Sequence, residues 1–68
     1  MEKGWVLVQK FALPFQAEVV KQMLLNNNIE SVVLDKHDSS FNSFGEVELY
    51  VNETDKALAL DLINKSEN

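Results

Sequence analysis

The sequence predicts an α+β domain whose elements follow one another in the order β-α-β-β-α, and three patterns in its 68 residues support this prediction. A segment that begins with proline has helical periodicity and runs directly into a β-branched segment, over residues 14–35. Residues 46–51 alternate strictly between polar and apolar side chains, which is typical of a strand with one buried face. Acidic residues then open a second stretch of helical periodicity near residue 53. We therefore expect three strands and two helices.

The first strand is predicted over the segment WVLVQKF, which begins at Trp5. Successive side chains of a strand point to opposite faces, so Val6 and Val8 are expected to share one face. The other face would then hold Trp5, Leu7 and Gln9. Both faces are therefore apolar in the first half of this strand.

The first helix is the element around which the rest of the chain is organised. It is predicted to begin at Pro14, whose missing N–H would have no intrahelical partner there and whose ring presets a helical φ angle. One side of this helix is expected to face a sheet, and it carries Ala17, Val20, Met23, Leu24 and Asn27. The asparagine run at residues 26–28 tolerates the left-handed conformation that a helix C-terminus commonly needs, so we expect the helix to end there.

The second strand is predicted to follow at once, over residues 29–35, because this segment is rich in β-branched residues. The alternation of a strand separates its side chains into two sets. One set is Val32 and Leu34, and the other is Ser31, Val33 and Asp35.

The third strand has the clearest pattern in the chain. Its inward residues are expected to be Val47, Leu49 and Val51, and its outward residues Glu46, Glu48 and Tyr50. Asn52 is suited to cap the helix that follows, which we place near residues 53–65. The apolar face of this second helix is centred on Ala59, Leu62 and Ile63.

The order of elements predicts the topology of the sheet. A right-handed β-α-β crossover makes the first two strands parallel. Placing the third strand beside the first, with both helices on one face, gives a split βαβ arrangement. We expect this arrangement, which resembles a ferredoxin-like fold without its last strand.

Size and composition limit the classes of function. The chain is expected to be a single domain over residues 1–68, ordered from about residue 5 to about residue 65, and a domain so small has little surface to bury. Eleven acidic and six basic residues give a net charge of −5, which disfavours nucleic-acid binding. No segment is apolar enough for a membrane span or has the pattern of a signal peptide, and there is no cysteine, so we expect a cytoplasmic protein that does not bind a membrane.

Chemistry-bearing residues are few. Asp35, His37 and Asp38 together offer two carboxylates and an imidazole, which could ligate a divalent metal, but their spacing matches no ligand motif and a single loop histidine is usually solvated. There is no nucleophilic cysteine and no glycine-rich phosphate loop, since Gly4 and Gly45 are the only glycines. We therefore expect neither a catalytic site nor a cofactor.

Two groups of residues are candidates for contact with a partner or ligand. Loop residues 36–45 carry His37, Phe41 and Phe44, and the two aromatics either pack back on the sheet or contact a partner. If both helices cover one sheet face, the opposite face is expected to expose Trp5, Leu7, Val33 and Tyr50. Such a face is either a surface for self-association or is covered by the loop at Trp5.

Several packing motifs carry a family resemblance. They are the helix start at Pro14, the Ala17-Glu18 pair inside the helix, the Ile29-Glu30 pair after it, and the run from Val47 through Leu49 and Val51 into an acidic helix with Asp55 and Ala57. Over about residues 6–63 the chain resembles small bacterial domains described as putative prokaryotic signal transducing proteins, which are related in fold to the PII nitrogen-regulatory proteins. The resemblance implies a PII-like fold and signal transduction, and it assigns no functional residue.

These observations lead to three functional hypotheses. The first is a non-catalytic binding or regulatory module that forms a dimer or larger oligomer through its sheet and recognises a small ligand or a protein through loop 36–45. The second is an accessory domain whose protein partner completes an open sheet edge by strand addition. The third, which has the least support, is a metal-dependent enzyme that uses Asp35, His37 and Asp38.

Overall fold

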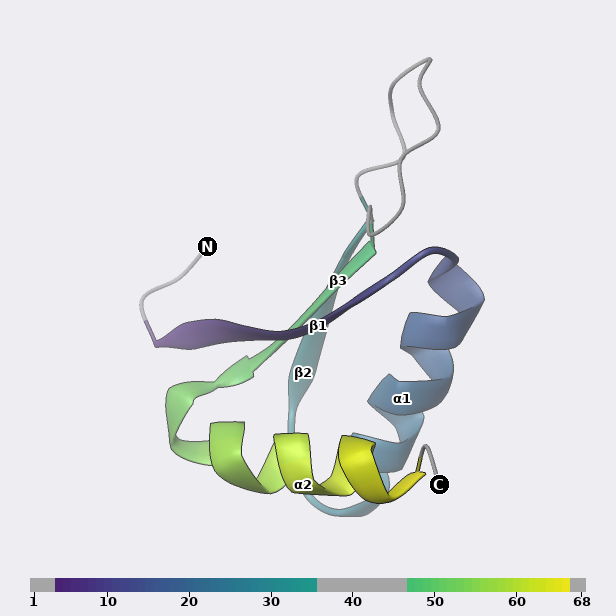
Figure 1. Cartoon of the computed structure of the whole chain (residues 1–68). Helices are drawn as coiled ribbons and strands as arrows, with labels where there is room; N and C mark the ends of the chain where they lie inside the picture. The colour runs from purple at the N-terminus through teal and green to yellow at the C-terminus, as the bar shows by residue number, and fades with distance from the viewer. Residues whose placement is uncertain (1–3, 36–46, 67–68) are drawn as a thin grey trace.

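A computed structural model describes residues 4–35 and 47–66 (Figure 1). Its elements are β1 (Trp5–Phe11), α1 (Pro14–Asn26), β2 (Ser31–Asp35), β3 (Val47–Asn52), the 3-10 turn η1 (Glu53–Asp55) and α2 (Lys56–Ser66). The order β-α-β-β-α agrees with the prediction from the sequence. No helix in these ranges is long and apolar enough to cross a membrane.

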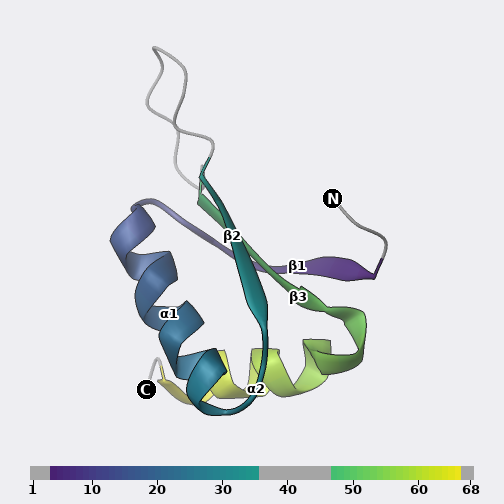
Figure 2. The same cartoon turned by 180° about the vertical axis from the view of Figure 1, so that it is seen from behind.

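The three strands form one sheet with β3 in the centre and β1 and β2 on the outside (Figures 1 and 2). β3 is antiparallel to both neighbours, so β1 and β2 run parallel to each other. This is the split βαβ topology that the sequence predicts. Helix α1 connects the two parallel strands β1 and β2, and β3 lies between them. Both outer strands consequently have one free edge among the described residues.

Both helices cover the same face of the sheet. The core of this face comes from β3, whose alternate residues Val47, Leu49 and Val51 are fully buried. The helices contribute four buried side chains to the same cluster: Ala17, Leu24, Ala59 and Ile63. The two small residues, one on each helix, allow the helices to approach the sheet closely. The opposite face of the sheet lies away from both helices.

Helix α1 begins without a polar cap residue, because Leu13 occupies that position. The third helical residue compensates: Oε1 of Gln16 accepts a hydrogen bond from the backbone N–H of Leu13 at 3.4 Å, and the Gln16 N–H donates to the Leu13 carbonyl at 3.2 Å. These two bonds satisfy groups that a helix start leaves without intrahelical partners.

The end of α1 explains why the asparagine run stops the helix. Asn28 has a φ angle of 64°, in the left-handed region that short polar side chains tolerate. The N–H of Asn28 donates to Leu25 O, and the N–H of Ile29 donates to Leu24 O, both at 2.9 Å. This is a Schellman motif, with Leu24 and Ile29 both buried as its usual hydrophobic contact.

The same motif corrects one boundary. The prediction that the second strand starts at Ile29 is wrong, because the backbone N–H of Ile29 closes the helix and its side chain packs in the core. β2 therefore begins two residues later, at Ser31.

A β-bulge in β1 corrects a second prediction. Leu7 lies opposite Tyr50 and Gln9 lies opposite Leu49, so Val8 is an extra residue on the β1 side. The extra residue reverses the alternation, and Gln9 faces the helices with Phe11 instead of sharing the face of Trp5. A strict period of two cannot reveal this reversal.

The start of the second helical segment agrees with the expected cap. The side-chain oxygen of Asn52 accepts hydrogen bonds from the Thr54 N–H at 3.1 Å and the Thr54 hydroxyl at 2.9 Å. Glu53 and Asp55 lie in this first turn, where the N-terminal end of a helix favours negative charge.

Candidate interaction surfaces

The sheet face that neither helix covers is the first candidate surface. Residues directly opposite each other in a sheet point to the same side, so the strand register defines rows across this face. One row joins Lys10, Glu48 and Leu34; the next joins Leu7, Tyr50 and Val32; and Trp5 lies opposite Asn52 at the end. We call this set the open face. Its large apolar and aromatic side chains are partly exposed, and Leu7 is the most exposed of these at 39%.

Glu48 lies within the open face and is only 8% exposed, although it points away from the helices. The Tyr50 hydroxyl donates a hydrogen bond of 2.9 Å to Oε1 of Glu48. The ammonium group of Lys10 lies 3.9 Å from Oε2, and the Lys10 side chain is 55% exposed. The open face therefore carries one negative and one positive side chain within a mainly apolar surface, and its formal charge is balanced.

The structure places three of the residues predicted for this face where the sequence put them: Trp5, Leu7 and Tyr50. The placement of Val33 on this face is wrong. Val33 lies opposite Leu49 and packs against the core under the helices, whereas its neighbours Val32 and Leu34 belong to the open face. The alternation in β2 separates these two sets correctly, but only the register with β3 decides which set faces the helices.

The other predicted contact residues, His37, Phe41 and Phe44, lie outside the described residues, as does Asp38. Asp35 ends β2 and lies opposite Val47, on the helix side of the sheet. No group of three or more histidine, cysteine, aspartate or glutamate side chains within residues 4–35 and 47–66 is arranged to hold a metal ion.

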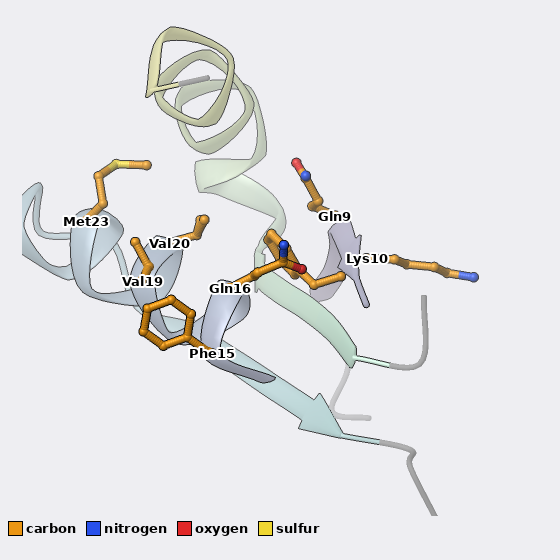
Figure 3. Close-up of a pocket in the computed structure, with 8 residues that line it drawn as sticks. Gln9, Lys10, Phe15, Gln16, Val19, Val20 and Met23 are labelled. Atoms are coloured by element: carbon orange, nitrogen blue, oxygen red, sulfur yellow. The ribbon is translucent and has the colours of Figure 1, made fainter. Parts of the chain in front are cut away.

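The second candidate surface is a groove of about 580 Å³ between β1 and the first half of α1 (Figure 3). We call it the edge groove, and it is lined by Gln9, Lys10, Phe11, Phe15, Gln16, Val19, Val20 and Met23. In Figure 3, the side chains of Val20 and Met23 extend toward the side where α2 lies, and Lys10 extends away from α1. A smaller hollow of about 290 Å³ shares Gln9 with this groove and is lined on the α2 side by Leu60, Ile63 and Asn64.

Sequence reasoning missed the edge groove. Its outer wall contains two strongly exposed apolar side chains, Phe15 at 74% and Val19 at 53%. They are four residues apart, so they are neighbours on one side of α1. Their position outside the apolar side of α1 was a signal in the sequence, because an aromatic residue on a solvent-facing side has no role in the core.

Within the described residues, the fold and these surfaces define a small α+β module with one sheet face that neither helix covers and a groove beside an edge strand. In the comparison with known families, the sequence model of the family described as "Putative prokaryotic signal transducing protein" matches residues 5–67. The chain belongs to this family. No curated protein and no solved structure gave a significant match.

Proposed function

We propose that the protein is a non-catalytic regulatory module of signal transduction, and that it acts by associating with a second copy of itself through the open face. The observation that supports this proposal most directly is the sheet face that no described helix covers. It presents a tryptophan, a tyrosine and three aliphatic side chains, and aromatic residues are frequent anchors of protein interfaces. The family description supports the signalling role.

The charges of the open face favour a second copy as the occupant. A two-fold interface brings the same patch from both copies together, so a contact from one residue to a second residue of the partner is repeated in the reverse direction. Lys10 and Glu48 provide one charge of each sign, and Lys10 is the more exposed of the two. A second copy can therefore place its Lys10 near Glu48 of the first, and the net charge of −5 need not oppose contact at this patch.

The small size of the chain also favours association. A domain of this length buries only about 60% of the surface of its unfolded chain, and covering the open face would add apolar burial on one whole side of the sheet.

Ligand binding is the second part of the proposal, and the predicted contact loop over residues 36–45 is its candidate site. We also propose a cytoplasmic setting, as expected from the sequence.

The test is the mass in solution by light scattering after size-exclusion chromatography. The native chain is expected to be a dimer or larger, and Trp5→Ser and Leu7→Ser are expected to shift it toward the monomer. Leu58→Ser is the matched control, because Leu58 is 51% exposed but lies on α2, away from the open face. Far-ultraviolet circular dichroism checks that each variant is folded. A native chain that stays monomeric at high concentration would contradict the proposal.

A second candidate function is an accessory domain whose partner completes the sheet. One observation favours it: β1 and β2 each have a free edge among the described residues. A thermal-shift screen separates the two candidates, since a metabolite that raises the melting temperature favours a regulatory module, whereas stabilisation only by a copurifying protein favours the accessory role.

A further inference from the structure

We propose that the free edge of β1 and the edge groove together bind an extended segment of another protein, which adds to the sheet as a fourth strand. The segment would carry apolar side chains at alternate positions and a carboxylate near Lys10. This inference rests on the second candidate function, the accessory domain whose partner completes the sheet, and it names the edge and the chemistry of the partner. Lys10 is the one residue that the edge groove shares with the open face.

The phase of the β1–β3 ladder shows which backbone groups face the free edge. The N–H of Glu53 donates to the carbonyl of Gly4 at 2.7 Å, just beyond the pair Trp5–Asn52. Bonded and non-bonded pairs alternate in an antiparallel ladder, so the odd-numbered residues of β3 direct their backbone groups toward β1. The even-numbered residues of β3 direct their backbone groups toward β2. Leu7 and Lys10 lie opposite two of them, Tyr50 and Glu48, so their own N–H and C=O groups point to the free edge of β1.

No described strand covers these outward groups, and an edge of this kind is a template for another extended chain. A helix cannot satisfy them, because all of its central backbone groups are already bonded internally. The edge therefore favours an extended partner.

The edge groove lies beside this edge on the helix side of the sheet. Gln9 and Phe11, whose side chains face the helices, line the β1 side of the groove, and Phe15 and Val19 line the side of α1. The side chains of an added strand alternate between the two faces, so every second one would enter the groove. Strand addition of this type uses backbone hydrogen bonds for affinity and side-chain pockets for specificity.

The lining of the groove limits what can enter it. Most of the groove is apolar, and Lys10 is the one charged residue of its lining. The Lys10 ammonium is 3.9 Å from Glu48, which is longer than a direct hydrogen bond, and its side chain is 55% exposed. A carboxylate on the incoming segment would therefore complement the charge at the rim.

The same charge argues for a different protein as the occupant and against a second β1. Strand β1 has the sequence WVLVQKF and contains no acidic residue. If the β1 strands of two copies paired, neither Lys10 would gain a carboxylate from the other strand. Gln9, on the helix side of the second strand, would also bring a polar amide toward an apolar groove.

The first test is selection of binders from a displayed library of short random segments against the native chain. The expected binders share apolar residues at alternate positions and an acidic residue. Their affinity should fall about tenfold or more in Phe15→Ser and Val19→Ser, since truncating an anchor of an interface has an effect of this order. Leu25→Ser is the matched control, because Leu25 lies on the same helix with 52% exposure, against 53% for Val19, and lies outside the edge groove.

The second test asks whether a selected segment binds as a strand. Amide hydrogen exchange is expected to slow at Leu7 and Lys10 when the segment is added, and to stay unchanged at Gln9 and Phe11, which already face β3. Two N-methylated versions of the segment are then compared, one methylated at its odd-numbered amides and one at its even-numbered amides. One version should lose binding and the other should keep it, because only every second amide faces β1.

Three outcomes would overturn the proposal. One is a selection that enriches no alternating pattern, and another is equal affinity for Val19→Ser and Leu25→Ser. The third concerns the protein without any added segment. If amide exchange at Leu7 and Lys10 becomes slower as the protein concentration rises, a second copy occupies the edge.

Discussion

Replacing Leu24 by alanine tests the packing on which the whole fold depends. Leu24 lies in α1 and is fully buried in the core under the sheet. It also makes the hydrophobic contact of the Schellman motif with Ile29, and its carbonyl accepts the Ile29 N–H. The backbone carbonyl is unchanged in Leu24→Ala, so the substitution removes only side-chain contacts.

The expected cost is about 2–5 kcal/mol of the free energy of unfolding, from the lost transfer energy of the side chain and the cavity that remains. A domain of this size has a total stability of roughly 3–10 kcal/mol. With an unfolding entropy of about 2.1 cal/mol/K per residue, each kcal/mol corresponds to about 7 °C in melting temperature. Leu24→Ala is therefore expected to melt at least about 14 °C below the native chain.

The chain provides a matched control in the next residue. Leu25 is in the same helix and is 52% exposed, so Leu25→Ala makes the same chemical change at the surface. Its expected effect is within about 0.5 kcal/mol. Urea denaturation followed by circular dichroism measures both variants. A loss below about 0.5 kcal/mol in Leu24→Ala, or equal losses in the two variants, would refute the packing described above.

Three further predictions concern single positions. Asn52→Ala is expected to cost about 1 kcal/mol in urea denaturation because it removes the cap of η1, and Asn52→Asp should restore most of it. Asn28→Val is expected to lower the free energy of unfolding by about 1–2 kcal/mol, because the left-handed backbone crowds a branched Cβ. Asn28→Gly is expected to leave it unchanged, and equal stabilities of the two variants would contradict this reason. Val33→Ser is expected to lower the melting temperature because it places a hydroxyl against the core. Val32→Ser, on the open face, should mainly reduce self-association in light scattering, and the opposite result would show that the register is wrong.

Local patterns predicted most elements, because the starts and ends of these helices and strands depend on residues that are close together along the chain. Pro14 starts a helix through its own ring, the asparagine run ends it through a left-handed residue, and Asn52 caps the next segment with its side chain. The alternation at Val47, Leu49 and Val51 likewise identified the buried face of the central strand. The split βαβ topology followed from the order of the elements and the handedness of crossovers.

The interaction surfaces depended on the tertiary structure. The bulge at Val8 turned Gln9 toward the helices, and the register with β3 moved Val33 into the core and left Val32 and Leu34 on the open face. No pattern within one strand contains this information, because register is set by pairing with residues far away in the sequence. The edge groove likewise exists only because α1 lies beside β1 in space. By itself, the sequence determined the elements and their order, while the pairing of the strands decided which side chains lie on the open face, since only contacts between distant segments define a surface.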